Sequence, residues 1–293
     1  MTEFVQQLLG GFATGSVYAL LALSLSVIYS GTGILNFAQG AMAVVSAFIC
    51  LTLATDGWSL WLAIPVVIAL SAIMGAVVER ILVKPVEGQP PLALFTVTAA
   101  LLLGIGGLVS IIWDNEQHAF ASPFGSEAVH LGPIVLTAQQ LGSTGVAVVV
   151  MVAVAVFFRY TDLGLCMRAV AINAPSAVLL GIRPGILIAA GWALAAGVGA
   201  VAGIMAAPTL SVSSNMMDGP LLLALAAAAL GGFGSRVGAV MGGLTIGVLD
   251  ALTGRYIPGL SGDLSIMLPF AVIWVVLMVR PLGVFGQASA VRA

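Results

Sequence analysis

The sequence predicts an all-α protein, a polytopic membrane bundle of eight or nine transmembrane helices. Of its 293 residues, 61% are hydrophobic and only 7% are charged, whereas a soluble domain carries about 25% charged residues. The few charges also leave long apolar windows, and each window holds at least one crossing of about 20 residues. These windows lie between Glu3 and Asp56, between Asp56 and Glu79, between Glu87 and Asp114, and between Glu127 and Arg159.

The apolar windows divide into spans at polar or glycine-containing stretches. The first window holds two spans, because Ser30-Gly31-Thr32-Gly33 predicts a break near residues 30–40. The region 219–254 is Gly-rich and its two spans are short, which predicts broken or re-entrant helices; these need protein or water around their free backbone groups. The predicted spans are 6–29, 36–55, 58–79, 92–113, 138–158, 184–207, 219–234, 237–254 and 264–280, all within a single transmembrane domain of residues 1–293.

Basic residues gather in the loops on one side of this topology. Cytoplasmic loops carry the excess of Lys and Arg, so we take the 80–91 loop as cytoplasmic. The opposite loop, Asp114 to Gln140, contains His118 and His130 but no Lys or Arg, and Arg255 is the one basic residue outside. The N-terminus is then outside an inner membrane and the C-terminus is cytoplasmic. The basic residues inside are Arg80, Lys84, Arg159, Arg168, Arg183, Arg236, Arg280 and Arg292.

Small residues recur every four positions in three spans. In lipid, such residues let helix backbones approach closely. Packing within the chain is the first interpretation, and lining of a pathway or a dimer seam is the alternative. The stripes are Gly191, Ala195, Gly199 and Gly203 in the sixth span, Gly11, Gly15 and Ala19 in the first, and Gly238 and Gly242 in the eighth.

The sequence does not predict an enzyme. Two histidines confined to one outer loop and two dispersed cysteines form neither a nucleophile with its base nor a metal site. A phosphate-binding loop needs a Gly-Lys-Ser/Thr run, but the only lysine, Lys84, is followed by Pro85. We therefore expect no cofactor on this chain, and its energy source must be another subunit or an ion gradient.

Asp250 is the only carboxylate that the sequence places within a span. Ion-coupled carriers keep ionisable residues near mid-membrane, so a role in a pathway is one interpretation. The other is a residue near the outer end of its span, satisfied by helix ends or by Arg255. One acidic residue gives little support for ion coupling, and the low charge suits a neutral or zwitterionic solute.

The cytoplasmic loop at about 159–183 is more apolar than a simple connector. Its Ala-rich stretches are divided by Asn173-Ala174-Pro175. Asn as a cap with Pro in the first turn predicts the start of a short helix. Such a helix either docks on a partner or rests on the lipid interface.

Several motifs carry a resemblance to one family of transport proteins. The chain resembles the integral membrane permeases of the bacterial branched-chain amino acid ABC transporter family, over nearly its whole length. Gln39 stands where the family's Asn-Phe-Ala-His-Gly signature has His, and the segment from Tyr256 to Pro269 is unlike the shorter link expected there. The motifs are Gly15 to Leu20 with Ile34 to Gly40, Glu79-Arg80 with Lys84-Pro85, Gly164 to Ile182, Ala229 to Ser235 with Gly238 to Gly243, and Arg280 to Gly286.

The resemblance implies a permease subunit for branched-chain or similar small amino acids. Its implied partners are a second permease subunit, two cytoplasmic ATPase subunits that bind ATP and Mg, an extracytoplasmic solute-binding protein and membrane lipid, with no nucleic acid. A coupling helix would run from Arg168 to Gly181 and move against the ATPase. Its implied coupling residues are Gly164, Arg168, Asn173, Ala177 and Gly181.

The residues on the solute path and the solute itself stay open at this stage. Asn36 and Gln39 are the first candidates for polar groups on the path, with interhelical hydrogen bonding as the alternative, and Asp250 is the third. Urea and short amides are alternative solutes. An ion-coupled carrier or channel, and an assembly subunit without a pathway, are the alternative functions.

Overall fold

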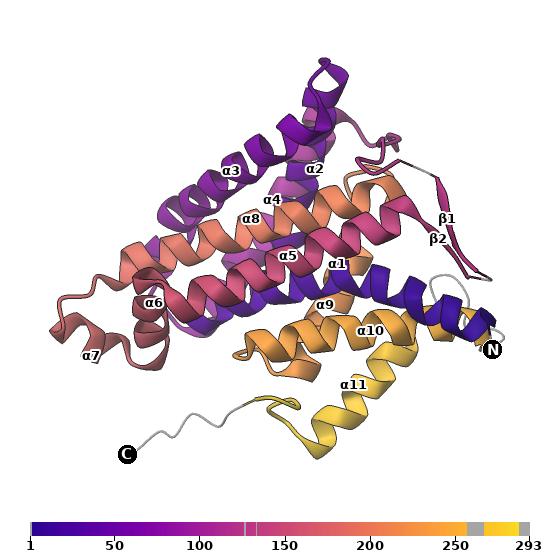
Figure 1. Ribbon diagram of the computed structural model, residues 1–293. Coiled ribbons are helices and arrows are strands. Elements are labelled where there is room, and N and C mark those ends of the chain that lie inside the picture. The colour runs from indigo at the N-terminus through magenta and orange to yellow at the C-terminus, as the bar shows by residue number, and fades with distance from the viewer. Residues whose placement is uncertain (1, 126, 133, 257–266, 287–293) are drawn as a thin grey trace.

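The computed structural model describes residues 2–125, 127–132, 134–256 and 267–286, and most of them are helical (Figure 1). A π-helical turn at Glu79–Val83 and a 3-10 turn at Lys84–Val86 extend α3. The helices are α1 (Thr2–Thr32), α2 (Gln39–Thr55), α3 (Leu60–Val78), α4 (Pro91–Trp113), α5 (Ala138–Tyr160), α6 (Asp162–Ile172), α7 (Ala174–Leu179), α8 (Pro184–Leu210), α9 (Asp218–Gly231), α10 (Arg236–Tyr256) and α11 (Met267–Val279).

Nine apolar helices of the described residues match the nine predicted spans. Six are long and apolar enough to cross a membrane, and the shorter ones cover Gln39–Thr55, Asp218–Gly231 and Pro269–Val279. The predicted polytopic helical fold is confirmed. The last predicted span, 264–280, begins outside the described residues. Most of the segment from Tyr256 to Pro269 also lies outside them.

The two regions predicted to be irregular differ in outcome. Near residues 30–40 the break is confirmed, because α1 ends at Thr32 and α2 begins at Gln39. α9 has 14 residues and is about 21 Å long, less than the ~30 Å of a hydrocarbon core. The span predicted at 237–254 is confirmed, but the broken or re-entrant helix expected there is wrong, since α10 is one continuous helix of 21 residues.

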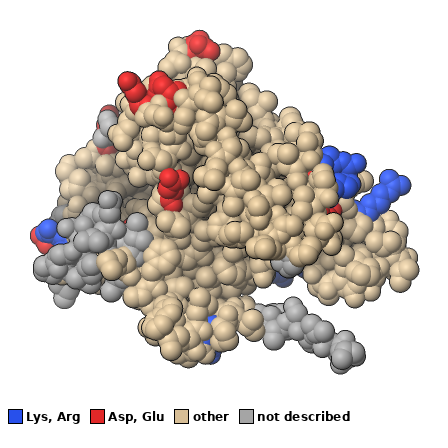
Figure 2. All heavy atoms as spheres, turned by 180° about the vertical axis from the view of Figure 1, so that it is seen from behind, with Lys and Arg blue, Asp and Glu red and all other residues tan. Residues whose placement is uncertain are grey.

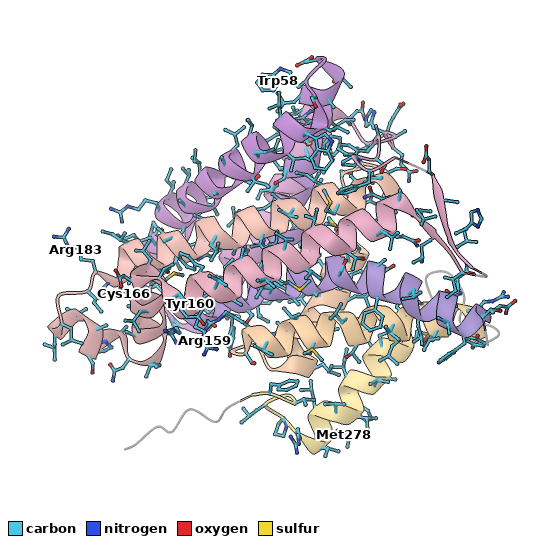
Figure 3. All side chains as sticks on the ribbon, in the orientation of Figure 1. Trp58, Arg159, Tyr160, Cys166, Arg183 and Met278 are labelled. Atoms are coloured by element: carbon cyan, nitrogen blue, oxygen red, sulfur yellow. The ribbon has the colours of Figure 1, made fainter. Side chains whose placement is uncertain are left out.

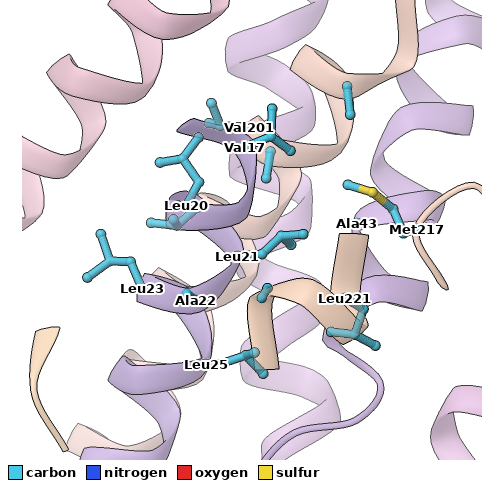
Figure 4. Packing of buried hydrophobic residues seen from close by; sticks show 14 of the residues in the cluster. Val17, Leu20, Leu21, Ala22, Leu23, Leu25, Ala43, Val201, Met217 and Leu221 are labelled. Atoms are coloured by element: carbon cyan, nitrogen blue, oxygen red, sulfur yellow. The ribbon is translucent and has the colours of Figure 1, made fainter. Parts of the chain in front are cut away.

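α1 runs through the middle of the bundle and packs against α10, α8, α9 and α5 (Figure 1). Its leucines Leu20, Leu21 and Leu25 are fully buried. Figure 4 shows them beside the helices that carry Val201 of α8 and Leu221 of α9. A helix that is apolar on all sides belongs in such a central position.

α1 and α10 approach closely along glycines of both helices. A Cβ atom on Gly243 would collide with the backbone of Ala19, and one on Gly247 would collide with the backbone of Gly15. A Cβ atom on Gly11 would lie 2.8 Å from Cα of Val248. The α1 stripe therefore lies against α10, on a face whose glycines the sequence analysis did not single out.

The other two stripes also lie at helix contacts. Cβ atoms on Gly238 and Gly242 would collide with backbone carbonyls of α9. Along α8, Gly199 and Gly203 face α2, and a Cβ atom on Gly191 would lie 3.2 Å from Cε of Met167 in α6.

The loop after α4 contains a hairpin that the sequence analysis did not predict. Strands β1 (Ala128–Leu131) and β2 (Ile134–Thr137) pair antiparallel. Earlier in the loop, His118 exchanges two backbone hydrogen bonds with Val212, at 2.9 and 2.8 Å. The backbone N–H of Glu116 donates to Asp114 Oδ1 at 2.7 Å, and this bond, helped by His118, lowers the pKa of the Asp114 carboxyl.

Basic side chains concentrate toward one end of the bundle. Figure 2 shows most of the visible Lys and Arg together at one edge and most Asp and Glu toward the other. In Figure 3, Arg159 and Arg183 lie at the end that carries α6 and α7, far from Trp58 at the α2–α3 turn. Two other basic segments reach the same end, because Lys84 lies beside Gly185 and Arg236 stacks on Phe158.

Candidate functional site

The segment between α5 and α8 consists of two short helices, α6 and α7. The single helix predicted from Arg168 to Gly181 is wrong, because α6 ends at Ile172 and α7 begins at Ala174. Asn173 separates the helices with an extended backbone, which interrupts the α-helical hydrogen-bond pattern.

Asn173 caps α7. Its Oδ1 accepts a hydrogen bond from the backbone N–H of Ser176 at 2.9 Å, and Pro175 lies in the first turn. The predicted Asn cap with a following Pro is confirmed. Gly181 has a φ of +80° where the chain leaves α7, a conformation that suits glycine because it has no Cβ.

α6 folds tightly against the end of α5. Thr161 caps α6, since its Oγ1 accepts from the N–H of Gly164 at 3.0 Å. A Cβ atom on Gly164 would collide with the carbonyl oxygen of Phe157 and lie 2.7 Å from Cα of Phe158. Gly164 thus permits the close turn that positions the two short helices.

A small core of its own holds α6, α7 and the start of α8 together. It consists of the buried residues Val170, Ala177 and Leu187, with Cys166 and Ile182 packed around them. Ala177 lies inside this core and is only 2% exposed. It supports α7 from within and presents no surface to a partner.

The exposed face of this segment is strongly apolar. Ile172, Leu179 and Leu180 are 87%, 88% and 79% exposed. Large apolar side chains exposed to this extent at the end of a bundle suit contact with a partner or with the lipid interface. We call these three residues the apolar tip; the sequence analysis did not single them out.

α6 stands on the ends of four longer helices. A cavity of about 20 Å³ lies beneath it, with walls from α1, α5, α6, α8 and α10. Trp192 Nε1 in this wall is buried without a hydrogen-bond partner among the described residues, as is Nε of Arg168 in α6. The Arg236 guanidinium stacks 4.1 Å from the ring centre of Phe158. A displacement of α6 would therefore be transmitted to α1, α5, α8 and α10.

Asn36 and Gln39 join the break after α1 to the middle of α8. Both are fully buried. Asn36 Nδ2 donates to Gln39 Oε1 at 3.2 Å, and Gln39 Nε2 donates to the carbonyl of Ala195 at 2.9 Å. Gly199 leaves space for the Gln39 amide, because a Cβ atom there would collide with Nε2. In this structure Gln39 makes the interhelical hydrogen bond and Asn36 supports Gln39 from the break before α2; the role of the two amides on a path stays a prediction.

Asp250 lies in the seam between α1 and α10, apart from both sites above. Tyr18 donates a hydrogen bond to Asp250 Oδ2 at 3.2 Å. Arg255, the basic residue named as its possible partner, is hydrogen-bonded to Glu3 at 3.4 Å. Neither the cavity under α6 nor the groove between α3 and α8 is lined by Asn36, Gln39 or Asp250.

Comparisons with known proteins place the whole chain in one family. Residues 7–277 match the family model described as branched-chain amino acid transport system / permease component. The chain belongs to this family. The permease is 30% identical to the high-affinity branched-chain amino acid transport system permease protein LivH of Escherichia coli K12, over 97% of its own length and 96% of LivH. It is 28% identical to the corresponding protein BraD of Pseudomonas aeruginosa, over 97% and 96% of the two chains.

More distant relatives share less. The permease is 25% identical to the fructose import permease protein FruF of Bifidobacterium longum, over 76% of its length and 65% of FruF. Among solved structures, a chain of PsaBC from Streptococcus pneumoniae in complex with Fab matches with a TM-score of 0.51 and 15% identity, over 94% of both chains. This last likeness concerns the fold alone.

Proposed function

We propose that the permease is the membrane-spanning subunit of an ATP-driven importer for branched-chain or similar small amino acids in a bacterial inner membrane. The observation that carries this proposal is the α6–α7 segment, which presents the apolar tip and rests on the ends of α1, α5, α8 and α10. Family membership supports the solute class, because the relatives LivH and BraD are named for branched-chain amino acids.

In this proposal the ATPase subunits cover the apolar tip. Burial of apolar side chains is the main favourable term of such an association. α6 and α7 then transmit ATPase movement to the bundle, since close-packed interiors transmit strain. ATP and Mg are bound by those subunits, while a second permease subunit and a solute-binding protein complete the importer.

The path for the solute requires a rearrangement of the polar contacts seen here. Asn36 and Gln39 remain the proposed polar groups on the path, with Asp250 as the third. Each makes a hydrogen bond within the chain, so a path would open only where α2 moves relative to α8, or α1 relative to α10.

Docking is tested by the double variant Leu179→Asp with Leu180→Asp. Two charges on the apolar tip are expected to abolish co-purification of the ATPase, because a buried charge without a partner is strongly unfavourable. The matched control is Leu92→Asp, an exposed leucine at the start of α4, which should retain the ATPase. Retention by the double variant would refute docking at the tip.

The solute is tested on the complex purified with its binding protein. Leucine should stimulate ATP hydrolysis, and urea or a short amide should not. If only urea or the short amide stimulated ATP hydrolysis, the solute would be that compound and not a branched-chain amino acid. Transport by the permease in liposomes without ATPase subunits would contradict the importer and favour an ion-coupled carrier or channel.

A further inference from the structure

A groove separates α3 from α8 on the outside of the bundle. Its volume is about 480 Å³. The two helices run side by side and meet near the end that carries α6 and α7 (Figure 1). The lining residues are Ile73, Ala76, Val77, Arg80 and Ile81 on one side, and Gly185, Ile186 and Ala189 on the other.

The groove is apolar along its length and open to the surroundings. Ile73, Ile81 and Ile186 are 60%, 63% and 58% exposed. From Ile73 to Arg80 the wall extends about 10 Å along the helix axis. In a membrane, a surface of this kind is in contact with lipid acyl chains.

Two cations stand at one end of the groove. Arg80 belongs to its lining, and Lys84 Nζ lies 3.4 Å from the position that a Cβ atom would take on Gly185. Among the described residues, neither cation has a hydrogen bond or ion pair within the chain. Their hydrogen-bond donors are therefore free to contact an external anion, although both cations also act on the buried Glu79.

The nearest carboxylate, Glu79, is within electrostatic reach of both cations but is not hydrogen-bonded to either among the described residues. Glu79 is fully buried, and its two carboxylate oxygens have no hydrogen-bond partner among the described residues. Arg80 is exposed on the following position of the same π-helical turn. Glu87 is the other carboxylate close to Glu79, and it is half-buried. The groove end thus presents positive charge beside an apolar surface.

We propose that this groove binds an anionic phospholipid. The phosphate lies between Arg80 and Lys84, and one acyl chain lies along Ile73, Val77 and Ile186. Basic pockets between transmembrane helices suit anionic headgroups. Free phosphate would use the cations but would leave the apolar wall uncovered, so a lipid fits the whole groove. The site is separate from solute transport and goes beyond that function.

The test measures lipids retained by the purified full chain, by native mass spectrometry after incubation with phosphatidylglycerol or phosphatidylcholine. Phosphatidylglycerol should be retained preferentially. Each basic residue near an anionic lipid contributes to the binding affinity. Removing both charges in Arg80→Gln with Lys84→Gln should therefore weaken phosphatidylglycerol binding about 30-fold. Arg159→Gln removes an exposed charge at the same end of the bundle and should leave binding unchanged.

A second variant fills the groove without removing charge. In Gly185→Leu the new Cβ atom would meet only the flexible end of Lys84, and the rest of the side chain extends toward the open groove, so the fold should persist while phosphatidylglycerol retention falls. Equal retention of the two lipids, or unchanged binding in both variants, would overturn the proposal. Displacement of phosphatidylglycerol by millimolar inorganic phosphate would assign the cations to free phosphate. A loss of self-association in Gly185→Leu, measured by light scattering, would assign the groove to a second copy.

Discussion

Gln39 is a single side chain that ties α2 to α8. Gln39→Leu removes the hydrogen bond to the Ala195 carbonyl and leaves Asn36 Nδ2 with only its weak contact to Met42 Sδ at 3.8 Å. Interhelical hydrogen bonds in membrane proteins contribute about 1 kcal/mol. The variant should unfold at a lower temperature in detergent, while Gln6→Leu, at an exposed position of α1, should not.

The same variant separates the two roles open to Gln39. If the amide only joins helices, transport per folded complex should stay close to wild type. A loss of transport much larger than the loss of folded protein would place Gln39 on the path. Equal unfolding temperatures for Gln39→Leu and wild type would contradict the packing role.

Asn173 is the cap on which the six-residue α7 depends. Asn173→Ala removes the bond to the Ser176 N–H, and loss of an N-cap costs about 1 kcal/mol. α7 should therefore open about fivefold more often, and chymotrypsin should cleave after Leu179, at the end of α7, correspondingly faster. Asn173→Asp retains a capping oxygen and should behave as wild type. Identical cleavage rates for the Ala and Asp variants would show that the cap does not hold α7.

At the scale of elements, the α1–α10 seam depends on glycine. In an exposed helix, Gly→Ala stabilises by up to about 1 kcal/mol, and Gly10→Ala has open space around its new Cβ atom. In Gly247→Ala the new Cβ atom collides with the backbone of Gly15. The two substitutions should shift the unfolding temperature in opposite directions, with Gly247→Ala lower than wild type. A rise in both would show that α1 and α10 separate without cost.

The sequence predicts an element well when local sequence signals determine it, and poorly when tertiary contacts do. Apolar length places the nine hydrophobic helices, and Asn173 with Pro175 marks the start of α7, because both signals are local. The end of α6 depends on Asn173 having an extended backbone, and the glycine face of α10 toward α1 depends on tertiary contact. The β1–β2 hairpin and the π-helical turn at Glu79–Val83 have no such periodic signal.

The candidate site was only partly accessible to sequence reasoning for the same reason. The α6–α7 segment is apolar and contains a cap, which predicts the start of α7 but not the division into two helices at Asn173. Which apolar residues face outward follows from the packing of α6, α7 and α8, and it puts Ala177 in the small core and Leu179 on the surface. Gln39 likewise has its partner on a helix about 150 residues later in the chain.

At the scale of the whole molecule, the charge distribution assigns a side to every loop. Lys and Arg favour the cytoplasmic side, so α6 and α7 should be inside and the loop with β1 and β2 outside. If all nine apolar helices cross, the N-terminus is also outside. α9 decides the side of the chain that follows it, because its 14 residues fall short of a full crossing.

Cysteine labelling decides both questions in one background, Cys50→Ser with Cys166→Ser. With a membrane-impermeant maleimide on intact cells, Glu127→Cys, Thr2→Cys and Tyr256→Cys should react, and Leu180→Cys should react only after permeabilisation. Protection of Tyr256→Cys alone, at the end of α10, would mean eight crossings, with α9 entering and leaving on one side. Reaction of Leu180→Cys from outside would carry more weight, because the apolar tip would then face away from any ATPase, and the coupling role proposed for α6 and α7 would fail with it.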